Sequence, residues 1–208
     1  PGDLEALFRE GYEAVFLGVG AWTCSRLRLP GEELPNVSGG VDFLRDVRLG
    51  KKTTVRGRVV VIGGGNVAID CARTARRLGA RSVEVFCLET RAAMPAHPWE
   101  VEAALEEGVV FHDGRAPRRL LERDGLFAGL ETLDVERVSF REGKQDLKTR
   151  PGTEKTFAGD ELIVAIGQRP ETAPFAEGGR IRLTPRGTFE VDPSTLMTSW
   201  PGVFAGGD

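Results

Sequence analysis

A glycine-rich turn between two regular segments is the feature that most limits how this chain can fold. The run Val-Val-Val-Ile at 59–62 comes directly before Gly-Gly-Gly-Asn at 63–66. The β-branched run predicts a buried strand, and residues 67–78 carry apolar side chains at helical spacing, with Gly79 placed to end the helix. A second apolar run at 83–88 completes a strand–helix–strand unit. The sequence therefore predicts an α/β fold with a parallel sheet.

The spacing of small residues in this turn predicts its ligand. Gly63, Gly65 and Ala68 form a G-x-G-x-x-A pattern. Backbone N–H groups at a helix start can point at a pyrophosphate if no side chain intervenes, and a small third residue lets the helix approach the strand. A tight turn that binds nothing is the alternative, which the complete strand–helix–strand context disfavours. The candidate dinucleotide-binding residues are Gly63, Gly64, Gly65, Asn66, Val67 and Ala68.

An acidic residue follows the second strand, where the adenosine ribose is read. Glu89 lies about 20 residues after Ala68, the offset of a carboxylate that accepts hydrogen bonds from the ribose hydroxyls. A carboxylate there repels a 2′-phosphate, so Glu89 favours NADH over NADPH. Arg91 opposes this preference because it could reach a 2′-phosphate, as could Arg26 or Arg28 if the fold brings them near. The remaining alternative is that Glu89 is a solvated loop residue.

Charge and hydrophobicity narrow the class of protein. The 208 residues include 28 lysines and arginines against 31 aspartates and glutamates, a net charge of -3. No large positive field is therefore available for nucleic acid or anionic lipid. No run approaches the roughly 20 apolar residues that span a bilayer. We expect no nucleic-acid or membrane partner and a cytoplasmic location.

The three cysteines do not form a recognisable reactive pair. Cys24, Cys71 and Cys87 show neither a C-x-x-C motif nor metal-ligand spacing. Disulfide reduction would need a close pair, and an iron–sulfur site would need a cluster. We expect no metal site and no catalytic thiol in this chain.

Other segments predict the domain organisation. Prolines and glycine at 30–35 mark a linker, and helical spacing recurs at 41–49 and 99–107. Alternating apolar and polar residues with turn signals at 125–157 predict an antiparallel β-meander. Short apolar runs at 12–19 and 161–166 predict two further parallel-sheet strands.

Five segments, in order along nearly the whole chain, carry a resemblance to a known family. They resemble the small (beta) subunit of glutamate synthase and related flavin reductase modules, including that of dihydropyrimidine dehydrogenase. The segments are GYEAVFLGVGA at 11–21, VVVIGGGNVAID at 59–70, MPA at 94–96, AIGQRP at 165–170 and PGVFAGGD at 201–208.

The resemblance implies a Rossmann-like nicotinamide-binding domain inserted into a partial FAD-binding domain. Residues 1–40 would be part of the FAD-binding domain and a linker, 41–157 the NAD(P)H-binding domain, and 158–208 the return to the FAD-binding domain. Gly167 would lie at a crossover between the domains. Gly207 and Asp208 would contact FAD, although Asp208 alone could be a helix N-cap.

Two departures from the family pattern matter. The family's first FAD fingerprint is absent from this chain, which begins at Pro1, so we expect a fragment of a longer protein that holds FAD only at full length. Where NADPH-using members carry two arginines, this chain has Leu88 and Glu89, which again favours NADH. Arg91 still matches the family.

The resemblance implies an oxidoreductase that passes hydride from NADH, or NADPH, to FAD. Electrons would continue to iron–sulfur clusters or to a partner resembling the glutamate synthase large subunit. Because cofactors perform this chemistry, no catalytic side chain is expected, and His97 and His112 receive no role. The alternatives are a flavin-less dinucleotide-binding or interaction module, and a reductase subunit serving ferredoxin or a pyrimidine-reducing partner.

Overall fold

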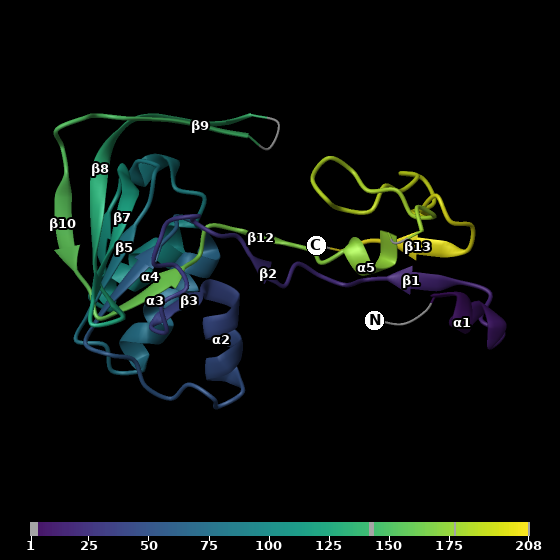
Figure 1. The fold of residues 1–208 in the computed structure, drawn as a ribbon, viewed down its shortest axis with the longest axis horizontal. Coiled ribbons are helices and arrows are strands. Elements are labelled where there is room, and N and C mark those ends of the chain that lie inside the picture. Colours follow the sequence, from purple (N-terminus) through teal and green to yellow (C-terminus); the bar gives the residue numbers. More distant parts are fainter. Residues whose placement is uncertain (1–3, 142–143, 177, 208) are drawn as a thin grey trace. The chain divides into compact units, whose positions relative to one another are not determined.

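The computed structural model describes residues 4–141, 144–176 and 178–207 (Figure 1). The chain divides into two compact units, each described separately below. The core unit is Cys24–Gly167, and the flanking unit combines the residues up to Thr23 with those from Gln168 onward.

A five-stranded parallel sheet forms the centre of the core unit. Its strand order is β3-β11-β4-β5-β6, and every neighbouring pair is parallel. The strand β4 is followed by the glycine-rich turn, the helix α3 and β5, so the predicted strand–helix–strand unit is confirmed. The strands are β3 (Val37–Gly39), β4 (Arg58–Ile62), β5 (Ser82–Phe86), β6 (Val110–His112) and β11 (Glu161–Val164).

Alternate residues of β4 point into two separate cores, as the twofold repeat of a strand requires. Val59 and Val61 pack with the helices, whereas Val60 and Ile62 pack with residues of an antiparallel sheet. The central sheet is therefore covered on both faces, and this explains why its strands read as continuous apolar runs.

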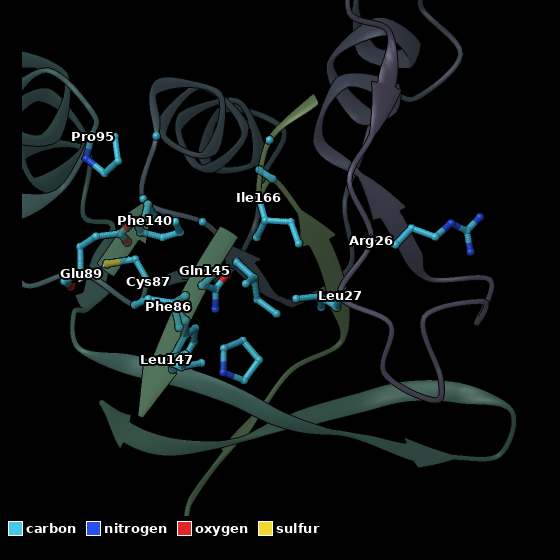
Figure 2. A pocket seen from close by; sticks show the side chains of 18 of the residues that line it. Arg26, Leu27, Phe86, Cys87, Glu89, Pro95, Phe140, Gln145, Leu147 and Ile166 are labelled. Carbon is cyan, nitrogen blue, oxygen red and sulfur yellow. Dashed lines mark hydrogen bonds between the residues drawn. The ribbon is translucent and has the colours of Figure 1, made fainter. Parts of the chain in front are cut away.

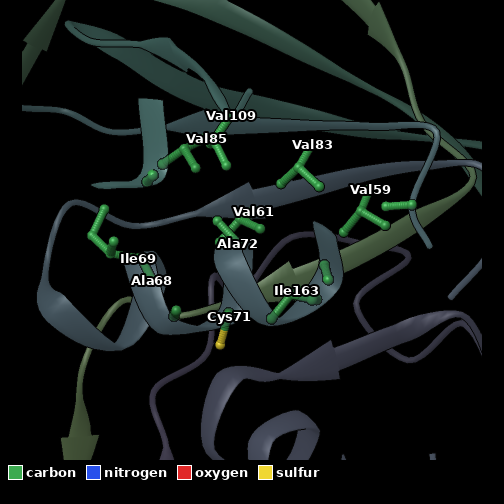
Figure 3. Packing of buried hydrophobic residues seen from close by; sticks show 14 of the residues in the cluster. Val59, Val61, Ala68, Ile69, Cys71, Ala72, Val83, Val85, Val109 and Ile163 are labelled. Carbon is green, nitrogen blue, oxygen red and sulfur yellow. The ribbon is translucent and has the colours of Figure 1, made fainter. Parts of the chain in front are cut away.

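In the described part of the core unit there are three helices and a single turn of 3-10 helix. The helix α3 approaches the sheet closely because Ala68, Cys71 and Ala72 are small and fully buried against Val61 and its neighbours (Figure 3). Gly79, at φ +90°, follows the end of α3 in the left-handed conformation that the sequence predicts. The helices are α2 (Gly40–Arg48), α3 (Asn66–Arg77), α4 (Pro98–Glu106) and the 3-10 turn η1 (Arg91–Ala93).

The predicted meander is present as an antiparallel sheet with strand order β10-β8-β7, and β9 pairs with the distal part of β8. The strand β7 was not predicted, because its sequence RAPRRLLER contains a proline and alternates poorly. Leu120, Phe127 and Leu130 bury one face of this sheet in the second core. The strands are β7 (Arg115–Arg123), β8 (Leu126–Arg141), β9 (Lys144–Thr149) and β10 (Lys155–Ala158).

The flanking unit contains a pair of parallel strands, β1 and β13, around a small core that includes Leu17, Ile181 and Val203. Short strands β2 and β12 pair in the connecting segments. The elements of the flanking unit are α1 (Leu4–Arg9), β1 (Val15–Leu17), β12 (Gln168–Arg169), α5 (Ala173–Ala176) and β13 (Val203–Ala205), and β2 (Thr23–Cys24) contains the 23/24 boundary.

The boundaries between the units differ from the sequence expectation. The contacts within the chain place them at residues 23/24 and 167/168, whereas the resemblance implied domain boundaries at 40/41 and 157/158. The reason is pairing: β3 and β11 are hydrogen-bonded in the same sheet as β4, so the segments that contain them belong to the core unit. In the part of the chain that the structure describes, no helix combines the length and apolar character needed to cross a membrane.

Candidate functional site

A cavity of about 610 Å³ lies at the carboxyl ends of β4, β5 and β11 in the core unit (Figure 2). Ligands of open α/β sheets bind at this edge, and the volume suits a cofactor-sized molecule. The residues that follow the strands and line the cavity are Gly63, Gly64, Gly65, Cys87, Leu88, Glu89, Ala165, Ile166 and Gly167. The rest of the lining includes Arg26, Leu27, Leu29, Phe86, Pro95, Pro117, Phe140, Gln145 and Leu147.

The fold itself requires glycine at the first position of the turn. Gly63 has φ +142°, and a Cβ atom added there would lie 2.2 Å from the carbonyl oxygen of Ala165 and 3.2 Å from the Cβ of Ala68. Strand β11 and helix α3 therefore approach the turn too closely for any side chain. This close helix–strand packing is the role predicted for Ala68.

Gly64 is also confined by its neighbours. A Cβ atom there would lie 3.0 Å from the Glu89 carboxylate and 3.2 Å from the Cβ of Cys87. The carbonyl oxygen of Gly64 accepts a hydrogen bond from the N–H of Ala96 at 3.0 Å. The residues after β5 thus pack directly against the turn.

Gly65 differs from both neighbours, because nothing in the fold requires glycine at this position. Its φ of -94° and ψ of 173° suit any residue, and no atom of the residues that the structure describes lies within 4 Å of an added Cβ. The position opens onto the cavity, which Gly65 lines. A glycine that the fold does not need, at the rim of a cavity, keeps space for something that approaches the backbone.

The helix α3 begins directly after Gly65, and no side chain among the described residues caps it. The first N–H groups of a helix lack partners within the helix, and its dipole favours negative charge at this end. Asn66 has a structural task, because its Oδ1 accepts the N–H of His97 at 2.9 Å. Val67 packs beside Gly40 of α2, where its Cγ1 would lie 3.3 Å from an added Cβ. The backbone of 65–67 is therefore what this helix start can offer to an anion.

Glu89 lies where a residue that binds the ribose hydroxyls would be needed. It is half-buried and lines the cavity beside Gly64. Its main-chain oxygen accepts the N–H of Gly114 at 2.9 Å, which fixes the backbone. Within the described ranges, the carboxylate has no hydrogen bond or ion pair with another side chain. Glu89 is thus held at the cavity with both carboxylate oxygens available for a ligand.

The candidate cations do not gather around Glu89. The Arg91 guanidinium lies 4.5 Å from the centre of the Phe111 ring, and Arg91 is not among the described residues that line the cavity. Arg26 does line it, but Figure 2 places Arg26 on the side away from Glu89. The backbone N–H of Arg28 donates a hydrogen bond to the Glu32 carboxylate at 2.9 Å, and Arg28 is not one of the described residues that line the cavity.

The candidates taken from the resemblance are divided between the two units. Gly167 lines the cavity with φ +112°, a conformation that favours glycine. Gly207 has φ +100° and belongs to the flanking unit. Asp208 lies outside the described residues.

Two cysteines and both histidines of the core unit have structural surroundings that account for them. Burial raises the pKa of the Cys87 thiol to about 12 and raises the pKa of Cys71 as well, so both stay protonated at neutral pH. His97 stacks on Trp99 with ring centres 4.3 Å apart, and His112 lies 2.7 Å from the Glu84 carboxylate. Among the described residues, no group of three or more potential ligands could hold a metal ion.

Sequence reasoning missed the wall of the cavity that β8 and β9 provide. Phe140, Gln145 and Leu147 come from these strands and line the cavity. Their alternation within the predicted meander indicates a shared apolar face. This alternation does not indicate which part of the core unit the shared face covers.

Comparisons with known proteins agree with this architecture. A family model, Pyridine nucleotide-disulphide oxidoreductase, matches residues 5–208. The NADP(+)-dependent formate dehydrogenase subunit beta of Moorella thermoacetica is 43% identical over 204 residues, covering 95% of this chain and 28% of that protein. The glutamate synthase [NADPH] small chain of Halomonas elongata is 36% identical over 216 residues, covering 96% of this chain and 45% of that protein.

A solved structure, thioredoxin reductase of T. acidophilum, has a TM-score of 0.72 at 22% identity and covers 94% of this chain and 57% of that chain. This likeness confirms the predicted Rossmann-like α/β fold. The match to a glutamate synthase small chain confirms the resemblance found in the sequence. The chain spans less than half the length of the two curated relatives.

Proposed function

Because the chain belongs to the pyridine nucleotide-disulphide oxidoreductase family, we propose that its core unit binds the nicotinamide dinucleotide of a flavin-linked oxidoreductase. The observation that carries this proposal is Gly65. Its backbone conformation suits any residue, and no atom of the described residues lies within 4 Å of an added Cβ, so we infer that the absence of a side chain serves a ligand. The cavity, the start of α3 and the Glu89 carboxylate surround the space at that position.

The proposed ligand fits these groups. Its pyrophosphate would lie over the backbone of 63–66, where the N–H groups and the dipole of the 12-residue helix α3 favour an anion. The ribose next to adenine would donate its hydroxyl protons to Glu89. The first of these contacts serves NADH and NADPH alike, whereas the second discriminates between them.

We propose that NADH is preferred. A 2′-phosphate would meet the Glu89 carboxylate, and Arg91, which could compensate, instead stacks on Phe111. The names of the Moorella and Halomonas relatives refer to NADP(+) and NADPH. The preference therefore rests on Glu89 and not on those relatives, and it can fail without removing the dinucleotide site.

The cofactors would perform the chemistry, with this chain holding and orienting them. When bound, the dihydronicotinamide would supply a hydride to FAD in the proposed longer enzyme. Its two electrons would continue to iron–sulfur clusters or a partner subunit, and its proton would be released to solvent. The flanking unit, with Gly207 and Asp208, would contribute part of the FAD-binding domain. Disulfide exchange needs a thiolate, and the raised pKa values of Cys71 and Cys87 do not favour one.

Calorimetric titration of the protein with NADH and, separately, NADPH tests the proposal, after a visible spectrum has been recorded for bound flavin. We expect saturable binding of both, tighter for NADH. Binding of neither would contradict the dinucleotide site. Tighter binding of NADPH would contradict only the role given to Glu89.

A further inference from the structure

The distal parts of β8 and β9 form a two-stranded ribbon with two unlike faces. Its register pairs Val138 with Leu147 and Phe140 with Gln145. Residues two apart in a strand share a face, so these four side chains lie on one side. On the other side, Arg137 and Asp146 form an ion pair at 2.9 Å, and both side chains are well exposed. The ribbon therefore has one largely apolar face and one charged, solvated face.

The largely apolar face of the ribbon is turned toward the cavity. Phe140, Gln145 and Leu147 line it together with the glycine turn and Glu89. Phe140 is nevertheless 57% exposed, so its packing within the protein accounts for less than half of its surface. A large aromatic ring left open beside a cavity can gain contact area from a ligand at little conformational cost.

The position of Phe140 selects one half of the dinucleotide. Figure 2 draws Phe140 on the side of Cys87 and Glu89, with Leu27 and Ile166 on the opposite side. In the proposed site Glu89 binds the ribose that carries adenine. The base attached to that ribose would therefore lie on the side of the cavity where Phe140 is.

We propose that the β8–β9 ribbon is the second wall of the dinucleotide site and that the Phe140 ring contacts the adenine base. This inference rests on the proposed function and adds an adenine subsite to it. Adenine is flat and aromatic, and stacking on a side-chain ring would use the exposed surface of Phe140. The charged face, with Arg137 and Asp146, takes no part in binding.

The experiment measures how the Phe140→Ala variant binds three ligands: NADH, ADP-ribose, which lacks nicotinamide, and reduced nicotinamide mononucleotide, which lacks adenine. Loss of an aromatic contact with a base raises Kd by about 5- to 150-fold. We expect this rise for NADH and ADP-ribose and no change for the mononucleotide. Phe140→Trp, which keeps a stacking surface, should retain affinity. Arg137→Ala is the matched control from the opposite face and should bind as the unmodified protein does.

Different outcomes separate the failure of this inference from failure of the proposed function. If the unmodified protein binds NADH and Phe140→Ala binds it equally well, the ribbon is not part of the site while the dinucleotide proposal stands. A loss for the mononucleotide but not for ADP-ribose would place nicotinamide at Phe140 and overturn the adenine subsite. If the unmodified protein binds neither NADH nor ADP-ribose, both proposals fall.

Discussion

Replacing Gly65 with valine should weaken ligand binding while leaving the stability of the fold nearly unchanged. The backbone at Gly65, with φ -94° and ψ 173°, is extended and favourable for valine, and within the described part of the chain an added Cβ meets no atom within 4 Å. Removing a glycine reduces the entropy of the unfolded chain and stabilises by about 0.4–1 kcal/mol. Glycine is also the N-cap of α3, and an apolar N-cap costs about 1 kcal/mol. These effects oppose each other, so the free energy of unfolding should change by less than about 1 kcal/mol.

Binding should respond much more strongly to the same change. The valine methyl groups would occupy the space through which a pyrophosphate approaches the N–H groups of 65–67. One hydrogen bond to a charged group is worth about 1.5–3 kcal/mol, and its loss raises Kd for NADH by about 10- to 150-fold. Calorimetric titration measures this rise, and thermal unfolding measures the stability.

The matched comparison is Gly63→Val, two residues earlier. Its side chain would begin 2.2 Å from the Ala165 carbonyl oxygen on a backbone with φ +142°, so we expect loss of folding. If Gly65→Val bound NADH as tightly as the unmodified protein, the backbone at Gly65 would not be the phosphate site. If Gly65→Val unfolded as Gly63→Val does, the glycine would serve the fold, and the main support for the proposed function would be lost.

Three further predictions concern specificity, pH and thiol reactivity. Glu89→Arg should shift the ratio of NADH to NADPH affinity toward NADPH by at least about tenfold, because the substitution replaces a carboxylate that repels the 2′-phosphate with a guanidinium that attracts it. An unchanged ratio would show that Glu89 does not contact the ribose. Asp160 accepts hydrogen bonds from Arg58, and these lower the pKa of its carboxyl group to about 2. The ionised carboxylate therefore contributes its full stabilisation above the unfolded-state pKa of about 3.9, and this stabilisation is lost as the pH falls through about 2. The melting temperature of Asp160→Asn should therefore fall below that of the unmodified protein at pH 7 and converge with it at low pH; a constant difference would refute this. Cys87, buried and with its pKa raised to about 12, should react with a thiol reagent at pH 8 far more slowly than Cys24, as mass spectrometry of the labelled peptides can measure; equal rates would contradict its burial.

The central strand–helix–strand unit could be predicted from sequence because its signals are local and agree. A β-branched run specifies β4, small residues on one helical face specify the close packing of α3, and Gly79 ends that helix. These features depend on neighbours within a few residues of sequence. The unit is therefore determined by local sequence as well as by the sheet around it.

The boundaries of the units depend on pairing between distant segments. Pro30 and Pro35 suggest a linker, but β3, which begins at Val37, pairs with β11 more than 100 residues later. The composition of a segment indicates whether it interrupts regular structure. It does not indicate which sheet the neighbouring strands join. The core unit therefore begins earlier, at Cys24, and ends later, at Gly167.

Part of the candidate site could be predicted from sequence, because it depends on where parallel strands end. The turn, Glu89 and Gly167 come to the cavity because the carboxyl ends of parallel strands share one edge. The stacking of Arg91 on Phe111 depends on a tertiary contact with β6. The position of Phe140 at the cavity depends on the pairing of β8 with β9. Nothing in the spacing of those residues along the chain specifies such contacts.

Amide hydrogen exchange with and without NADH tests the central claim most directly, since it locates the ligand without any substitution. We expect slowed exchange for the backbone of 64–67 and for residues 87–89, which follow β5, where the cavity lies. Protection confined to residues outside the cavity, or no protection at saturating NADH, would contradict it.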